Sequence, residues 1–222
     1  NAPIADKITL FANTREGGGI RGLTVFLVDA DTKGISIGKE EDKMGIRASA
    51  TAEIIFEDCF VPDSARVGKE GRGFMIAMQT LQMSRPVVAA ISVGIAQAAI
   101  EAAVAYSHHR KQFGVKIATF EMVQQMIADM VMKTEAARIL TYKACVAQMN
   151  KDKKAGLYSA MSKCFASDTA MEVTTTAVQV MGGNGYSREN PVEKYMRDAK
   201  IMQIYEGTNQ IQRLVIANEA TF

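Results

Sequence analysis

The spacing of the apolar residues changes near Gly71-Arg72-Gly73, and this change constrains the fold of the chain more than any other feature. Before it, short segments rich in β-branched and aromatic residues alternate with turn residues, a pattern typical of β-strands. These segments cover residues 7–12, 23–28, 35–37 and 52–57. Because no helical segment separates them, they predict an antiparallel sheet or part of a barrel.

Beyond this point the apolar residues follow the 3.6-residue period of amphipathic helices. Five helices are predicted, at about residues 74–110, 119–149, 154–181, 191–199 and after 208. Thr119 is the expected N-cap of the second helix, Pro191 the expected first residue of the fourth, and Gly182-Gly183 the stop of the third. Pro86 lies inside the first helix, where it either kinks the helix or is accommodated by a distorted turn.

Short links between long helices predict an antiparallel bundle, so the expected fold class is α+β. We expect a short antiparallel β segment, part of a β-barrel domain, over residues 1–66, and a bundle of the four-helix type over residues 67–222. The net charge of +2 gives no electrostatic reason to bind nucleic acid. An uninterrupted run of about 18 apolar residues is absent, so no transmembrane span is predicted.

No metal site is expected either. The three cysteines, Cys59, Cys145 and Cys164, are widely spaced, and the two histidines, His108 and His109, are adjacent in sequence. Neither arrangement provides the ligand spacing of a metal site, and an odd number of scattered thiols is typical of a reducing compartment. The 14 methionines are expected to fill gaps in the core rather than to form a binding surface.

The segment 204–212, Ile-Tyr-Glu-Gly-Thr-Asn-Gln-Ile-Gln, carries the candidate chemistry. Gly207 would let the backbone approach a ligand closely, and Thr208 and Gln210 could bond a polar cofactor. Glu206 could remove a proton from a carbon acid, provided that the carboxylate lies within hydrogen-bond reach of it. The alternative is an ordinary helix start, with Thr208 as the N-cap and a buried face formed by Ile211, Leu214 and Val215.

Two further segments could contact a phosphate-bearing cofactor. Residues 110–114, Arg-Lys-Gln-Phe-Gly, offer a guanidinium that can grip phosphate and a ring that can pack on adenine or flavin. Residues 179–186, Gln-Val-Met-Gly-Gly-Asn-Gly-Tyr, hold three glycines whose bare backbone could cradle a ligand. The alternatives are a charged helix end with a glycine stop and a glycine-rich loop between helices. No βαβ unit surrounds the glycines, so they are not a dinucleotide-binding fingerprint.

Together these segments resemble the motifs of the acyl-CoA dehydrogenase family, and the resemblance covers essentially the whole chain. In that family the Glu before Gly-Thr removes the α-proton of the thioester, and Glu206 stands at that position with Tyr205 and Gly207 beside it as substrate-binding residues. The resemblance also implies a set of FAD-binding residues: Arg110, Gln112, Phe113, Gln179, Gly182, Gly183, Thr208 and Gln210.

Residues 82–85, Gln-Met-Ser-Arg, lie where family members place contacts to acyl-CoA, so Gln82, Ser84 and Arg85 are implied substrate-binding residues. Members often have an acidic residue at the position of Gln82. Some members with branched or long substrates carry their base on the first long helix, at the position of Ser84. Because serine is no base, the role stays with Glu206, which favours short or medium straight acyl chains.

The resemblance implies an enzyme of fatty acid metabolism that converts acyl-CoA to trans-2-enoyl-CoA. Glu206 would remove the pro-R α-proton, the β-hydrogen would pass as hydride to flavin N5, and an electron-transfer flavoprotein would accept the electrons. A homodimer or homotetramer is implied, with Arg110 and Gln179 reaching the FAD of a neighbouring subunit. The expected compartment is the cytoplasm of a bacterium or the mitochondrial matrix of a eukaryote.

Three alternatives remain open: an acyl-CoA oxidase, a flavin monooxygenase of the same fold, or a non-catalytic oligomerisation fragment. The intact Glu206-Gly207-Thr208 argues against the last, because packing needs no carboxylate there. In the family, an N-terminal helical domain and a tryptophan-bearing strand that lines the flavin come before the position of Asn1, and this chain has no tryptophan. The 222 residues alone are therefore expected to fold, to bind FAD poorly and to turn over no acyl-CoA.

Overall fold

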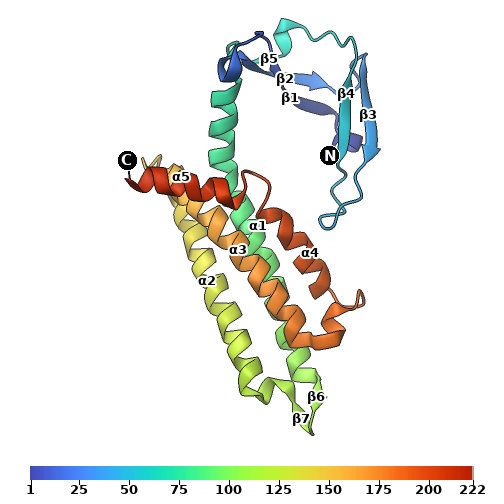
Figure 1. Ribbon diagram of the computed structural model, residues 1–222, viewed down its shortest axis with the longest axis vertical. Coiled ribbons are helices and arrows are strands. Elements are labelled where there is room, and N and C mark those ends of the chain that lie inside the picture. The colour runs from blue at the N-terminus through green and yellow to red at the C-terminus, as the bar shows by residue number, and fades with distance from the viewer. Residues whose placement is uncertain (222) are drawn as a thin grey trace. The chain divides into compact units, whose positions relative to one another are not determined.

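The computed structural model describes residues 1–221, and its chain forms two compact units, Asn1–Leu81 and a second from Gln82 onward. The first unit is rich in strands and the second is helical (Figure 1). The predicted domain boundary, between residues 66 and 67, lies before the first long helix. The two compact units instead meet between Leu81 and Gln82, within that helix.

The strand unit contains the four predicted strands and one more. Its strands are β1 (Lys7–Asn13), β2 (Leu23–Asp29), β3 (Ile35–Glu40), β4 (Ala52–Phe56) and β5 (Arg66–Val67). All pairs are antiparallel, as predicted, but among the described residues they form two sheets, β1-β2-β5 and β3-β4, rather than one. The sequence did not predict β5, because two residues are too few to show an alternating pattern.

Strand β2 is the centre of the larger sheet, and its position explains its apolar sequence. Val25 and Val28 are 2% and 3% exposed, and Val25 lies between Phe11 of β1 and Val67 of β5. Thr24 is fully buried, and its hydroxyl pairs with that of Thr14 at 2.8 Å and accepts a hydrogen bond from the Gly71 N–H at 3.0 Å. The loop before the first helix is therefore fixed to the sheet.

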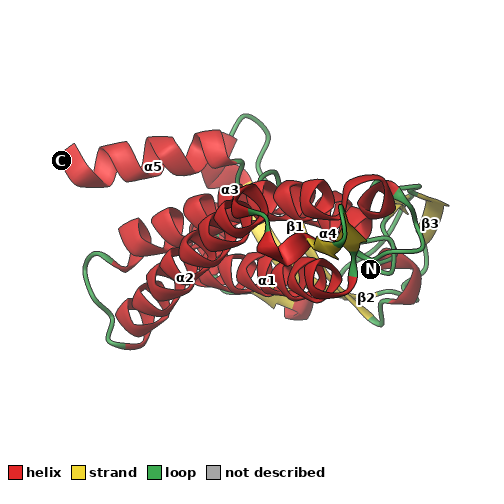
Figure 2. Ribbon diagram, turned by 90° about the horizontal axis from the view of Figure 1, so that it is seen from below, coloured by secondary structure: helices red, strands yellow, loops and turns green. Residues whose placement is uncertain are grey.

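All five predicted helices are present, and α1, α2 and α3 lie side by side with alternating direction (Figures 1 and 2). The helices are α1 (Gly73–His109), α2 (Glu121–Met149), α3 (Ala155–Met181), α4 (Val192–Met202) and α5 (Asn209–Thr221). The antiparallel bundle is confirmed. Pro86 is accommodated within α1, which continues through it. Helix α4 runs past the predicted end at residue 199 to Met202, and Pro191 is its N-cap rather than its first residue.

The predicted N-cap of α2 is wrong. Thr119 belongs to a short 3-10 turn, Ile117–Thr119, and its hydroxyl donates to the Lys116 carbonyl at 2.7 Å. Phe120 occupies the N-cap position without a side-chain cap, and α2 begins at Glu121. The threonine satisfies a local turn carbonyl instead of a helix N–H, an alternative always open to short hydroxyl side chains.

Small side chains fill the interior of the bundle. Its main core combines Ala96, Ala99 and Ala103 of α1 with Ala170 and Ala177 of α3, each at most 1% exposed. Alanine at the contacts lets the helix axes approach closely, as ridges-into-grooves packing requires. Its larger members are Ile100 of α1, Met130 of α2, Val192 of α4 and, on α3, Val173, Val180 and Met181.

The methionines do not follow the single role that the sequence suggested. Met130, Met181 and Met202 are buried, at 5% exposure or less, and fill the core as expected. Met122 and Met149, at the two ends of α2, are 78% and 82% exposed. Gap-filling therefore explains only part of the methionine content.

Helix α1 is long and apolar enough, by length and composition, to cross a membrane. The sequence alone did not predict this, because the helix contains no uninterrupted run of 18 apolar residues. It contains an 18-residue window of mean hydropathy 1.9, and 44% of that window is buried in the protein. Ala96, Ala99, Ile100 and Ala103 of this helix belong to the bundle core. Core packing thus accounts for much of its apolar character.

Candidate functional site

The loop that joins α4 to α5 carries the predicted base. It spans residues 203–208, and at its centre Glu206 and Gly207 have φ angles of +57° and +87°. A non-glycine residue in this left-handed region costs about 1 kcal/mol, so the surroundings must hold Glu206 there. At Gly207 a Cβ would lie 2.6 Å from Nε2 of Gln212, so a larger residue would displace that side chain and would also be strained at the positive φ. Gly207 therefore admits the Gln212 side chain, a role that the sequence did not suggest.

Two buried side chains hold the carbonyl groups of this loop. Gln212 of α5 donates from Nε2 to the Glu206 carbonyl at 3.2 Å and to the Gly207 carbonyl at 3.0 Å. Lys163 of α3 donates from Nζ to the Gly207 carbonyl at 2.8 Å and to Oδ1 of Asn209 at 2.9 Å. Both side chains are fully buried, and burial lowers the pKa of the Lys163 amine to about 8.

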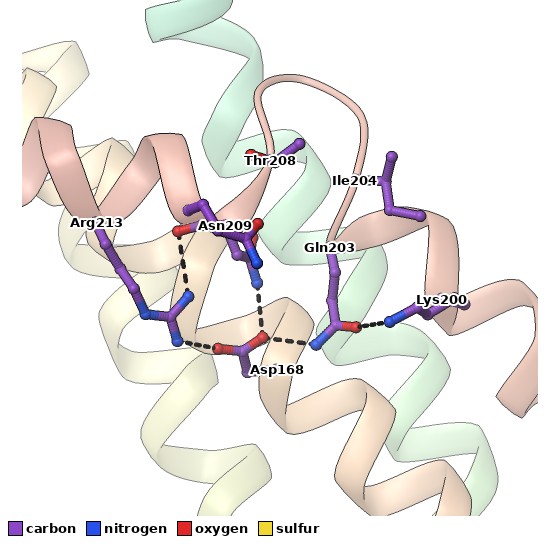
Figure 3. Close-up of a pocket in the computed structure, with 8 residues that line it drawn as sticks. Asp168, Lys200, Gln203, Ile204, Thr208, Asn209 and Arg213 are labelled. Atoms are coloured by element: carbon purple, nitrogen blue, oxygen red, sulfur yellow. Dashed lines mark hydrogen bonds and ion pairs between the residues drawn. The ribbon is translucent and has the colours of Figure 1, made fainter.

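Asp168 of α3 anchors both ends of the same loop (Figure 3). Its Oδ1 accepts from Gln203 at 2.6 Å and from Asn209 at 2.7 Å, and its Oδ2 accepts from Arg213 at 2.6 Å. Burial by itself raises the pKa of the Asp168 carboxyl, but these three donors outweigh it and hold the pKa below its usual value. The ionised carboxylate thus connects the end of α4 and the start of α5 to α3.

The side chain of Glu206 meets helix α1. Its Oε2 accepts a hydrogen bond of 2.5 Å from the Ser84 hydroxyl. The next residue, Arg85, is 8% exposed, and its Nε finds no hydrogen-bond partner within residues 1–221. Burial lowers the pKa of the Arg85 guanidinium, and the charge of Glu206 opposes that effect. Burial and the same charge raise the pKa of Tyr205. A carboxylate between a hydroxyl donor and a buried cation can accept a proton from a bound molecule.

Gln82 lies apart from Ser84 and Arg85, although the sequence grouped the three. Its carbonyl accepts from Gln148 Nε2 at 3.0 Å, and its amide packs against Gly156, where a Cβ would lie 3.2 Å away. Gln82 therefore faces the turn between α2 and α3. Of the three implied substrate-binding residues on α1, Ser84 contacts Glu206 and Arg85 lies close enough to interact with its charge.

Thr208 and Gln210 line a cavity of about 440 Å³ beside Asp168 (Figure 3). Thr208 also accepts a hydrogen bond from the Ile211 N–H at 3.3 Å, which is the N-cap role of the alternative interpretation. The buried face of that alternative is wrong, because Ile211 and Leu214 are 47% and 61% exposed. The other lining residues are Lys200, Gln203, Ile204, Asn209 and Arg213.

The other two predicted segments meet at a second cavity, of about 360 Å³, although they are distant in sequence. Arg110 and Gln112 line it together with Gly182 and Gly183. The remaining lining residues are Tyr106, Ile117, Val180, Met181 and Asn184. An arginine and a bare glycine backbone that line the same cavity can together bind phosphate.

Phe113 and Gly114 form a feature that the sequence did not predict. They are the two turn residues of a hairpin between β6 (Lys111–Gln112) and β7 (Val115–Lys116), with φ angles of +51° and +82°. Positive φ at both positions is typical of a type I′ hairpin turn. The hairpin leaves Phe113 93% exposed, and its ring lies 6.3 Å from that of Phe120, while Phe113 does not line the cavity beside Arg110.

The two cavities lie at different levels of α3. One is beside Asp168, and the other is at Gly182, which follows the last residue of the helix. At 1.5 Å per residue the helix between them is about 20 Å long. Six of the eight residues implied in FAD binding thus fall into two separate groups within one chain, and Phe113 and Gln179 line neither cavity.

Sequence reasoning missed Lys163, Asp168, Asn209 and Gln212. The signal available was a lysine within the stretch of mostly small residues 159–167, Ser-Ala-Met-Ser-Lys-Cys-Phe-Ala-Ser, in the third predicted helix. Lysine is almost never fully buried unless paired, so its position there indicated a polar partner.

Comparison with known proteins identifies both parts of the chain. Residues 1–59 match the family model described as acyl-CoA dehydrogenase, middle domain, and residues 71–221 match acyl-CoA dehydrogenase, C-terminal domain. A Mycobacterium bovis protein named "Probable acyl-CoA dehydrogenase fadE25" is 51% identical over 94% of this chain and 54% of its own length.

Two solved structures are similar throughout. Butyryl-CoA dehydrogenase of Megasphaera elsdenii has a TM-score of 0.96 at 47% identity, over 99% of this chain and 57% of that one. A chain in a structure of the electron transferring flavoprotein of Acidaminococcus fermentans has a TM-score of 0.95 at 51% identity, over 98% of this chain and 57% of that one. The present chain therefore spans little more than half the length of these relatives.

Proposed function

Because this chain belongs to the acyl-CoA dehydrogenase family, we propose that it carries the base and much of the cofactor site for FAD-dependent α,β-dehydrogenation of an acyl-CoA. The observation that supports this most directly is the Glu206 carboxylate, which the left-handed loop presents to Ser84 beside the buried Arg85. A side chain present only for stability would not require a carboxylate on a strained loop residue.

The residues present fit the chemistry of FAD. Arg110 and the bare backbone at Gly182 and Gly183 would hold phosphate or the adenosine half, and Thr208 and Gln210 would offer polar contacts at the other cavity. FAD, when bound, would supply the acceptor for a hydride from the β-carbon.

The side chains of this chain would carry the proton chemistry. Glu206 would take the pro-R α-proton of the thioester while the C–H electron pair forms the new double bond of trans-2-enoyl-CoA. Ser84 would orient the carboxylate through its hydrogen bond to Oε2. The buried charge of Arg85 would stabilise negative charge that develops near it in the transition state.

We also propose that a second copy of the chain completes the site. One chain places its candidate FAD residues in two groups about 20 Å apart along α3, so the Arg110 group of one subunit would serve the FAD of its neighbour. A homodimer or homotetramer follows. The exposed side chains of Phe113 and Gln179 are compatible with contacts to another subunit.

Substrate, partner and compartment are proposals that rest on similarity. Similarity to butyryl-CoA dehydrogenase supports a short-chain substrate, and similarity to a chain in an electron transferring flavoprotein structure supports that protein as the electron acceptor. We retain the cytoplasm of a bacterium, or the mitochondrial matrix of a eukaryote, as the proposed compartment.

The test is Glu206→Gln in the full-length, FAD-loaded protein, with acyl-CoAs of graded chain length. Flavin content and acyl-CoA affinity should persist, and the rate at which acyl-CoA bleaches the flavin should fall by two to four orders of magnitude, roughly what a general base contributes. A variant that bleaches within a few-fold of the wild-type rate would remove Glu206 from the mechanism. Hydrogen peroxide released by the wild type without an acceptor protein would favour an oxidase.

A further inference from the structure

A lysine in the interior of the bundle contacts the loop that presents Glu206. Lys163 lies on α3, is fully buried, and donates from Nζ to the Gly207 carbonyl at 2.8 Å and to Asn209 Oδ1 at 2.9 Å. Its first partner is the residue directly after Glu206. Its second is the first residue of α5, where the loop ends.

Packing alone does not account for a lysine at this position. Burial of an amine costs free energy unless hydrogen bonds compensate, and an apolar side chain of similar length would fill the same space without that cost. The hydrogen bonds that compensate Lys163 go to the Gly207 carbonyl in the loop and to the side chain of Asn209, where the loop ends. The amide of Asn209 in turn donates to Asp168. The polar group is thus placed where it determines the path of the loop.

The loop needs such support because its two central residues are left-handed. Glu206 has φ +57°, which a residue with a side chain rarely adopts. Gln212 also donates to the Glu206 and Gly207 carbonyls, but it lies on α5, only six residues beyond Glu206, and so belongs to the segment that the loop itself leads into. Lys163 is the contact that connects the Gly207 carbonyl to α3, a helix of the bundle core.

We propose that Lys163 is a positioning residue for Glu206: its bond to the Gly207 carbonyl keeps the loop left-handed and the carboxylate against Ser84. This inference rests on the proposed role of Glu206 as the base. A displacement of about 1 Å at a reacting group lowers a rate by about 100-fold, so loss of this contact is expected to act on the chemical step more than on substrate binding.

The experiment uses the full-length, FAD-loaded protein and compares Lys163→Met with Thr174→Val. Thr174 lies on the same helix, is equally buried, and donates only to helix carbonyls, to that of Ala170 at 2.7 Å and that of Met171 at 3.2 Å. Three quantities are measured: the single-turnover rate of flavin bleaching by butyryl-CoA, the dissociation constant for butyryl-CoA, and hydrogen–deuterium exchange of a peptide covering residues 203–212.

For Lys163→Met we expect bleaching to slow by roughly 10- to 100-fold, the dissociation constant to change less than about threefold, and exchange in the loop peptide to rise at least about tenfold. Thr174→Val should leave all three near wild type. If Lys163→Met does not accumulate as folded protein, Lys163→Gln, which keeps a polar head group, is measured in the same way and should show the same direction of change.

A double variant separates positioning from a general structural role. If Lys163 acts through Glu206, adding Lys163→Met to Glu206→Gln should slow bleaching by less than about threefold further, because the group to be positioned is already lost. Fully additive losses, or a bleaching rate for Lys163→Met within threefold of wild type, would overturn the inference while leaving the base intact. A fully active Glu206→Gln would instead overturn the proposed function, whatever the exchange of the loop.

Discussion

Lys163 also determines how the stability of the helical unit should depend on pH. Burial lowers the pKa of its amine from 10.5 to about 8. At about 1.4 kcal/mol per pKa unit this difference corresponds to about 3 kcal/mol. Below about pH 8 the amine is protonated in the folded and the unfolded chain, and the folded state bears the full cost of burying the charge. Between about pH 8 and 10.5 the folded chain loses the proton while the unfolded chain keeps it, so the free energy of unfolding rises with pH.

The measurement is urea unfolding of the wild-type chain and of Lys163→Met, followed by the circular dichroism of the helices from about pH 7 to 10.5. Cys164, a neighbouring thiol whose pKa burial raises, is present in both proteins, so the difference between the two free energies reports mainly on the lysine. Over this range the wild type should gain about 3 kcal/mol relative to the variant.

Lys154→Met provides the matched control, because Lys154 is an exposed lysine directly before α3. Its free energy of unfolding should keep a nearly constant offset from the wild type across the same range. If the difference in the free energy of unfolding between wild type and Lys163→Met also stays constant within about 1 kcal/mol, burial does not lower the pKa of this amine as argued.

Two further substitutions test the loop and the base. Gly207→Ala places a Cβ 2.6 Å from Gln212 Nε2 at φ +87°, so the free energy of unfolding, measured with urea, should fall by about 1–3 kcal/mol. Gly94→Ala, on α1 with open space around it, should leave the free energy of unfolding unchanged or raise it by up to about 1 kcal/mol. A loss of the same size at both glycines would contradict the steric argument. Ser84→Ala removes the 2.5 Å hydrogen bond to Glu206 and should slow flavin bleaching by about tenfold in the full-length enzyme. The control is Ser92→Ala, which removes a hydroxyl that donates to the Val88 carbonyl at 2.8 Å and should not change the rate. Equal rates for the two variants would contradict the role of Ser84.

The sequence predicted the helices well because each long helix repeats its apolar period many times. It failed where the signal is short or local. The hairpin around Phe113 and Gly114 consists of two-residue strands, which are too short to show a periodic pattern. The Thr119 hydroxyl could have capped a helix N–H or bonded a turn carbonyl, and in the structure it donates to the Lys116 carbonyl. Local alternatives of this kind are decided by surrounding structure.

The candidate site was predictable in its residues but not in its support. The residues around Glu206 also allowed an ordinary helix start, and the family resemblance singled out its carboxylate as the base. Lys163 was not, because a lysine in a helix is ordinarily read as solvent-exposed, and only the fold shows that its amine reaches the Gly207 carbonyl at 2.8 Å. Gly207 was singled out for a ligand, yet the atom close to it is Gln212 Nε2.

The separation of the two cavities allows the proposed subunit sharing to be tested directly. Arg110 lines the cavity near Gly182, and Glu206 lies on the loop whose residues Gln203, Ile204 and Thr208 line the other cavity. The two cavities are about 20 Å apart along α3. If each FAD uses Arg110 of one subunit and Glu206 of another, the two residues of one active site belong to different chains. Variants at the two positions should then complement each other in mixed dimers.

The experiment mixes full-length Arg110→Glu and Glu206→Gln chains, each inactive alone, by joint refolding with FAD. Random pairing gives about half mixed dimers, and each mixed dimer holds one site with both residues intact and one with neither. Activity should therefore recover to about a quarter of the wild-type value per dimer. If both residues of a site came from the same chain, every site in the mixture would lack one of them, and activity would stay at the level of the separate variants. Recovery near a quarter supports the shared site, and no recovery, with dimers and bound flavin verified, contradicts it.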